Sequence, residues 1–123
     1  MKGEIKMRNI KFRAWDKWEK RMIKPHNGDF IKWHAMSNWK DCLEVMQYTG
    51  LKDKNDTEIY DGDIVQLANG VKQKVYWENE IFAWNVERFS RNGRVNYIML
   101  YELRDITTFE VIGNIYEHPE LLG

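Results

Sequence analysis

Four aspartates stand close together near the middle of the chain, and carboxylates so spaced could hold a hard cation. They are Asp53, Asp56, Asp61 and Asp63. A calcium-binding loop that begins at Asp53 requires Gly at its sixth position and Glu at its twelfth. The chain has Glu58 and Ile64 there instead. We therefore expect no metal site in this segment and assign its aspartates to turns.

A second set of candidate ligands, His26, His34 and Cys42, is also poorly spaced. Zinc ligands usually pair roughly two to five residues apart, and a fourth ligand is missing. A Cys-His nucleophile would need a third group to orient the imidazole. The chain also has no phosphate-binding loop, dinucleotide fingerprint or serine-nucleophile elbow. We predict a non-catalytic protein without cofactors, in which Cys42 is a small buried hydrophobe.

Basic and aromatic residues alternate near the N-terminus and form the best candidate binding site. The candidate residues are Lys11, Arg13, Trp15, Lys17, Trp18, Lys20, Arg21 and Trp33. Proteins that bind single-stranded nucleic acid combine a cationic groove with aromatic rings on which bases stack. The neutral total charge argues against this function, because dedicated nucleic-acid binders are usually basic overall. Nucleic-acid binding is therefore the alternative function.

Charge is distributed unevenly along the chain although its total is zero. Residues 1–40 carry eleven Lys/Arg and four Asp/Glu, which gives +7, whereas residues 41–123 carry eight and fifteen, which gives −7. The two halves are expected to pack against each other, within one chain or between subunits. Trp and Tyr are also favoured anchors of protein interfaces. We therefore predict a protein-interaction or self-assembly module, with a homo-oligomer or a protein partner.

The elements that position these residues are expected to be mostly strands. Aromatic residues make up 14% of the chain, and aromatic side chains favour strands. Residues 10–15 alternate apolar and polar side chains, which predicts a strand, and a second is expected at 18–23 after a turn at Asp16-Lys17. Residues 25–29 predict a further turn before a returning strand at 30–33.

Residues 34–47 allow two interpretations. Ser37 could cap a helix that Gly50 closes, or residues 43–48 could form a strand. We favour a short helical or irregular segment followed by a strand from about Leu43.

The second half of the chain predicts a series of hairpins. Asn-Gly pairs at 69–70 and 92–93 are typical of hairpin turns, and residues 50–62 are polar and turn-rich. Strands are predicted for residues 64–68, 71–77, 81–89, 95–103 and 107–112. Short strands at regular spacing indicate a barrel or sandwich. We predict a mainly β fold, a small partly open SH3-like barrel with an N-terminal β-hairpin and little helix.

One domain of 123 residues is expected. Within it, residues 1–6 would be a polar extension, 7–40 a basic aromatic hairpin region and 41–123 the barrel core. The apolar stretches are too short to span a membrane, and no signal peptide is evident. A single cysteine fits a reducing compartment, so we expect a cytoplasmic location.

Three blocks of sequence resemble the YopX family of phage and prophage proteins. They are IKFRAWD at 10–16, MQYTGLKDKN at 46–55 running into EIYDGDIV at 58–65, and VIGNIYE at 111–117 followed by PELL at 119–122. The resemblance implies a compact β fold with a small barrel, a phage accessory protein in a bacterial host cell and no known catalytic residues. One departure is Asp56, where the family often has Gly. Asp tolerates positive φ, so the turn is expected to form.

Several residues of these blocks are predicted to be architectural. The structural turn motif consists of Gly50, Asp61, Gly62, Asp63, Gly113 and Asn114. Gly62 would supply a backbone conformation closed to other residues, and its flanking aspartates would accept backbone N–H bonds. Gly113 and Asn114 would reverse or bulge the last strand.

Overall fold

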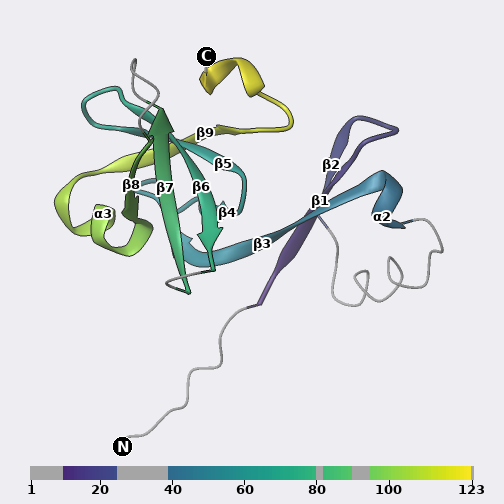
Figure 1. Cartoon of the computed structure of the whole chain (residues 1–123), viewed down its shortest axis with the longest axis horizontal. Helices are drawn as coiled ribbons and strands as arrows, with labels where there is room; N and C mark the ends of the chain where they lie inside the picture. Colours follow the sequence, from purple (N-terminus) through teal and green to yellow (C-terminus); the bar gives the residue numbers. More distant parts are fainter. Residues whose placement is uncertain (1–9, 25–38, 80–81, 90–94, 123) are drawn as a thin grey trace, which may run out of the picture.

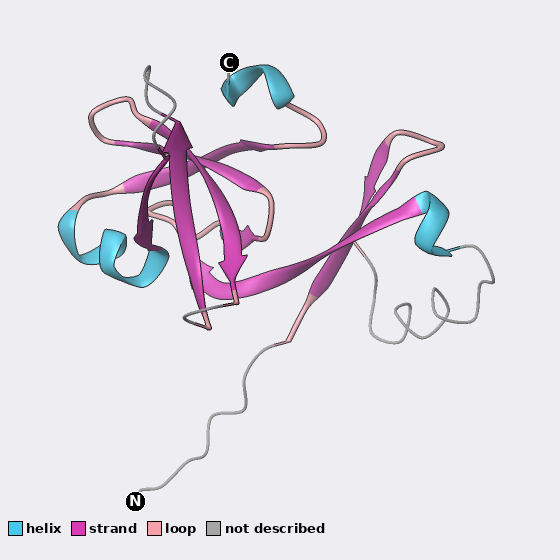
Figure 2. Ribbon diagram, in the orientation of Figure 1, coloured by secondary structure: helices cyan, strands magenta, loops and turns pink. Residues whose placement is uncertain are grey.

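The computed structural model describes residues 10–24, 39–79, 82–89 and 95–122, and within them the chain forms two antiparallel sheets (Figures 1 and 2). The first, in the order β2-β1-β3-β4, contains β1 (Phe12–Asp16), β2 (Arg21–Ile23), β3 (Leu43–Lys52) and β4 (Glu58–Tyr60). The second, in the order β8-β7-β6-β5-β9, contains β5 (Asp63–Leu67), β6 (Lys72–Glu78), β7 (Ala83–Phe89), β8 (Val95–Met99) and β9 (Phe109–Asn114). The helices are α2 (Trp39–Cys42), α3 (Leu100–Ile106) and the 3-10 turn η1 (Pro119–Leu122). The second sheet curls into a half-barrel, so the prediction of a mainly β, partly open barrel is confirmed.

Strand β3 is shared between the N-terminal hairpin and the barrel side of the molecule. Its first half pairs with β1, and its second half pairs with β4 through Tyr48 and Lys52. Figure 1 shows β3 running from α2 across to the curled sheet. Gly50 lies where the register with β4 shifts and has φ +87°, which only Gly adopts readily. The sequence predicted a turn at Gly50, and the structure places a bulge within a strand there.

The main core lies inside the curled sheet. Its fully buried side chains come from β4, β5, β6, β7, β9 and α3: Ile59, Val65, Val75, Val86, Leu100, Leu103 and Phe109. A smaller cluster of Ala14, Cys42 and Leu43 lies under the hairpin. Cys42 is buried, as predicted. The start of β3 at Leu43, after one helical turn, is also confirmed.

The predicted strand at 95–103 is wrong in its second half. The strand ends at Met99, and residues 100–106 form α3. Leu100 and Leu103 are 0% and 3% exposed and both contribute to the core. Residues three apart share one face of a helix but point to opposite faces of a strand. The helix is therefore the conformation that buries both leucines.

The bounds of the last predicted strand shift as well, and several predictions fall outside the described residues. The last strand begins at Phe109 and includes Gly113 and Asn114, so this pair lies within β9. The register bulge that was expected there falls between Gly113 and Val111. The turn at 25–29, the strand at 30–33 and the turn at 92–93 lie outside the described residues, as do His26 and His34. No helix in the described ranges is long and apolar enough to cross a membrane.

The turn after β3 is organised by the side chain of Asp53. Its Oδ1 accepts hydrogen bonds from the N–H groups of Asn55 and Thr57, both at 2.9 Å, and its Oδ2 accepts one from the N–H of Val111 at 2.8 Å. The carboxylate therefore closes the turn and ties it to β9. Asp56 occupies the left-handed region with φ +66°, as its position in the turn predicts.

We expect Asp56→Gly to raise the free energy of unfolding by up to about 1 kcal/mol, because a non-glycine residue is strained at positive φ. The variant also loses the exposed ion pair between Lys52 and Asp56, which contributes only about 0.5 kcal/mol. Urea unfolding monitored by tryptophan fluorescence would measure the difference. Asp56→Ala is the control and should lower stability. A Gly variant less stable than the Ala variant would contradict the explanation.

Candidate functional site

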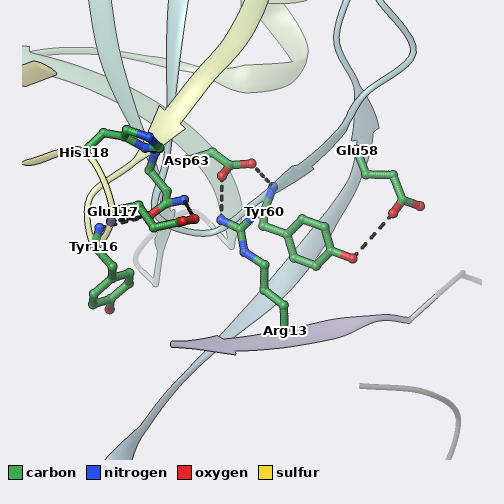
Figure 3. A network of polar contacts seen from close by, with 8 residues as sticks. Arg13, Glu58, Tyr60, Asp63, Tyr116, Glu117 and His118 are labelled. Carbon is green, nitrogen blue, oxygen red and sulfur yellow. Dashed lines mark hydrogen bonds and ion pairs between the residues drawn. The ribbon is translucent and has the colours of Figure 1, made fainter. Parts of the chain in front are cut away.

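The two sheets are joined by a buried ion pair between Arg13 of β1 and Asp63 of β5 (Figure 3). Arg13 Nη2 donates to Asp63 Oδ1 at 2.5 Å, and the two side chains are 9% and 1% exposed. The other oxygen of Asp63 accepts the N–H of Tyr60 at 2.7 Å. The Arg13 guanidinium also lies over the Tyr60 ring, 4.5 Å from its centroid. A charged group so deeply buried needs this set of partners to be stable.

Burial raises the pKa of the Asp63 carboxyl, whereas the Arg13 guanidinium and the Tyr60 N–H act in the opposite direction. Removing one partner of such a pair leaves an uncompensated charge in the interior. The Arg13–Asp63 pair is therefore a structural joint and is not available to a ligand.

Two further cations of the predicted nucleic-acid site are paired with carboxylates. Lys11 Nζ lies 2.5 Å from Glu58 Oε2, and Lys17 Nζ lies 3.3 Å from Glu44 Oε1. With Arg13–Asp63, these pairs each join a base from residues 1–40 to an acid from residues 41–123. The oppositely charged halves of the chain thus pack together within one molecule. Phosphate groups would have to compete with these carboxylates for three of the predicted contacts.

The remaining predicted site residues differ in their exposure. Trp15 is half-buried and stacks on Tyr116, with the ring centroids 6.0 Å apart. Trp18, Lys20 and Arg21 are exposed at and just after the tip of the β1–β2 hairpin, where Trp18 is 67% exposed. Trp33 lies outside the described residues.

The turn after β9 is organised by Asn114. Its Oδ1 accepts the N–H groups of Tyr116 and Glu117 at 3.1 and 2.8 Å, and its Nδ2 donates to Glu117 Oε1 at 2.8 Å. The neighbouring Gly113 faces the imidazole of His118, and a Cβ built there would lie 2.6 Å from Nδ1. Gly113 is therefore required for close packing, while its φ is not in the left-handed region. Gly62 does have positive φ, at +84°.

The four aspartates considered as metal ligands have separate environments. Asp53 and Asp63 are occupied by the hydrogen bonds described above, and Asp56 is exposed beside Lys52. Within the described ranges, no group of three or more His, Cys, Asp or Glu side chains could hold a metal ion. Asp61, by contrast, lines an open space between elements of the fold.

That space is a cleft of about 440 Å³, lined by residues of the first sheet and of β6 and β7. We call it the inter-sheet cleft, and it is lined by Phe12, Val45, Gln47, Asp61, Trp77 and Trp84. The two Trp rings are directly opposite in the β6–β7 pairing and meet edge to face, 5.2 Å apart at 69°. Trp77 is 39% exposed, and Phe82, which directly precedes β7, is 79% exposed. Pockets of roughly this size bind side chains and small molecules.

Asp61 brings a negative charge to the inter-sheet cleft without forming an ion pair among the described residues. Burial raises the pKa of its carboxyl, and Lys74 and Arg13 lower it to a smaller extent. Both of these cations are committed elsewhere, since Lys74 lies 3.3 Å from Glu87 and Arg13 pairs with Asp63. A half-buried carboxylate without its own cation is typical of functional sites.

This cleft was not predicted from the sequence. Asp61 was predicted to be a turn residue, and Phe12, Trp77 and Trp84 were not among the predicted site residues. One signal was present, because a hairpin between 71–77 and 81–89 places Trp77 opposite Trp84 on one face. The approach of Phe12 and Asp61 depends on how the two sheets pack, and no local pattern contains that information.

Comparisons with known proteins agree with the observed fold. The model of the family described as YopX protein matches residues 11–123. Among solved structures, the crystal structure of protein EF1440 from Enterococcus faecalis is 27% identical with a TM-score of 0.53, and the match covers 93% of this chain and 98% of that chain. A comparison with curated proteins gave no match.

We expect Asp63→Asn to lower the free energy of unfolding by about 3 kcal/mol or more, because it leaves the Arg13 guanidinium buried without a counter-charge. Lys17→Gln, which breaks an exposed pair, should change it by less than about 1 kcal/mol. Chemical denaturation of both variants, with Arg13→Met and the double variant to complete a thermodynamic cycle, measures the coupling. A loss below 1 kcal/mol for Asp63→Asn, or no coupling in the cycle, would show that the pair does not hold the sheets together.

Proposed function

The chain belongs to the YopX protein family, and on that premise we propose that it is a phage-type, non-catalytic module whose inter-sheet cleft binds a segment of a protein partner. The observation that carries this proposal is the aromatic lining of the cleft. Trp77 and Trp84 come from the curled sheet, and Phe12 comes from the sheet of the hairpin. Trp and other aromatic side chains in partly enclosed pockets are the usual anchors of protein interfaces.

The charge distribution favours a separate protein partner over the two alternatives. Three cross-half ion pairs form within one chain, so this part of the opposite charge is satisfied without a second subunit. The same pairs occupy three of the cations on which nucleic-acid binding would depend. The cleft itself carries a carboxylate, which repels phosphate.

The proposal is tested by panning a library of random linear peptides against the immobilised full-length chain. Enriched peptides are then titrated by calorimetry against the wild type, Trp77→Leu and Trp18→Ala. We expect Trp77→Leu to weaken binding at least about tenfold, because it removes an interface anchor. Trp18→Ala, at the distant hairpin tip, is the matched control and should bind as the wild type does. Peptides that bind Trp77→Leu equally well, or a library that yields none, would overturn the proposal.

Nucleic acid is the second candidate, because the exposed Trp18, Lys20 and Arg21 lie together around the hairpin tip. Anisotropy titrations with labelled single- and double-stranded oligonucleotides at low and moderate salt separate the two functions. Binding that weakens with salt, is lost in Trp18→Ala and survives in Trp77→Leu would replace the protein partner by nucleic acid. Absence of binding at low salt would remove this candidate.

A further inference from the structure

Resting on the proposed function, we infer that the inter-sheet cleft accepts a cationic side chain, a lysine or an arginine, from the bound partner. Asp61 would be its counter-charge, and the rings of Trp77 and Trp84 would face its apolar stem and charged head. Three features support this inference: the uncompensated carboxylate, the aromatic lining and a pattern that the chain repeats elsewhere.

The chain twice places its own cation between a carboxylate and an aromatic ring. Arg13 lies between Asp63 and the ring of Tyr60, 4.5 Å from its centroid. Lys11 lies between Glu58 and the ring of Tyr48, 5.6 Å from its centroid. Both arrangements combine an ion pair with a cation–π contact, which reinforce each other where water is partly excluded.

The inter-sheet cleft contains the same two partners but no cation of its own among the lining residues. Asp61 supplies the carboxylate, and Trp, the best ring for a cation–π contact, lines the cleft twice. The two indole rings meet edge to face, at an angle of 69°. The cavity of about 440 Å³ has room for one long side chain with adjacent partner atoms. A neutral or acidic side chain would leave the Asp61 charge uncompensated.

The pKa of the Asp61 carboxyl in the free protein agrees with the absence of a cation beside it among the described residues. Three neighbouring groups lower the pKa of the Asp61 carboxyl: Lys74, Arg13 and the Gly62 N–H. Tyr116 also lies close enough to interact with Asp61. Burial outweighs these groups and raises the pKa above 3.8. When the pKa of an acid is raised in the folded state, the protein loses stability as the pH rises from the pKa of the unfolded state through the raised pKa of the folded state.

Asp61→Asn should therefore be more stable than the wild type at about pH 7 and unfold at a higher temperature. The difference should vanish near pH 3, where the carboxyl is protonated in both states. Thermal unfolding at the two pH values measures it. A less stable Asn variant at neutral pH would mean that Asp61 is already compensated within the chain, which would overturn the inference.

Binding is tested directly with N-acetyl-lysine methylamide and N-acetyl-arginine methylamide as probes. N-acetyl-norleucine methylamide has the same apolar stem as lysine without the charge. In heteronuclear NMR titrations of the full-length chain we expect the indole N–H signals of Trp77 and Trp84 to shift with the cationic amides at dissociation constants on the order of millimolar. Asp61→Asn should weaken binding about tenfold, whereas Asp41→Asn, an exposed aspartate on α2, should leave it unchanged.

The outcomes separate this inference from the proposed function. Norleucine amide that shifts the indole signals as strongly as lysine amide, or cationic binding that persists in Asp61→Asn, would overturn the cation site. Enriched peptides that need Trp77 but contain no Lys or Arg would overturn it too and leave the proposed function intact. Cationic amides that bind at Asp61 while no peptide is enriched would support the site and contradict the protein partner.

Discussion

The buried ion pair between Arg13 and Asp63 is the constraint on which the rest of the structure depends. It connects β1, in the sheet of the hairpin, to the first strand of the curled sheet, and it does so where both side chains are removed from water. Burying two charges has a large desolvation penalty, which only good geometry and further hydrogen bonds offset. The Tyr60 N–H and the Tyr60 ring supply that support. The pair thereby sets the relative position of the sheets, and with it the walls of the inter-sheet cleft.

Local patterns predicted much of the fold, because they depend on interactions between near neighbours. The alternation at 10–15 gave β1, the Asn-Gly pair at 69–70 marked the β5–β6 hairpin, and Asp56 took the left-handed conformation that its turn requires. The predictions that were wrong concern segments whose conformation is decided by long-range packing. Residues 100–103 are apolar enough for a strand, yet the helix is the form that directs both Leu100 and Leu103 into the core.

The candidate site was harder to predict than the fold for the same physical reason. The basic residues near the N-terminus carry a strong compositional signal, but composition does not reveal that Lys11, Arg13 and Lys17 have carboxylate partners far along the chain. The aromatic residues of the inter-sheet cleft come from two sheets, and only the Trp77–Trp84 pair is visible in a hairpin pattern. A surface built by packing two sheets together has no signature in either one alone.

Asp61 and Asp63 show how environment separates two chemically identical groups on either side of one glycine. Gly62, with its positive φ, turns the chain so that Asp63 begins β5 facing Arg13, while Asp61 lines the inter-sheet cleft. Burial raises the pKa of both carboxyls, but among the described residues only Asp63 has a cation in contact. The fold therefore compensates the charge that it needs for its own joint and leaves the neighbouring charge uncompensated beside two indole rings. A half-buried carboxylate with a raised pKa in a cleft is a candidate functional group, and the inferred partner cation would complete its pairing.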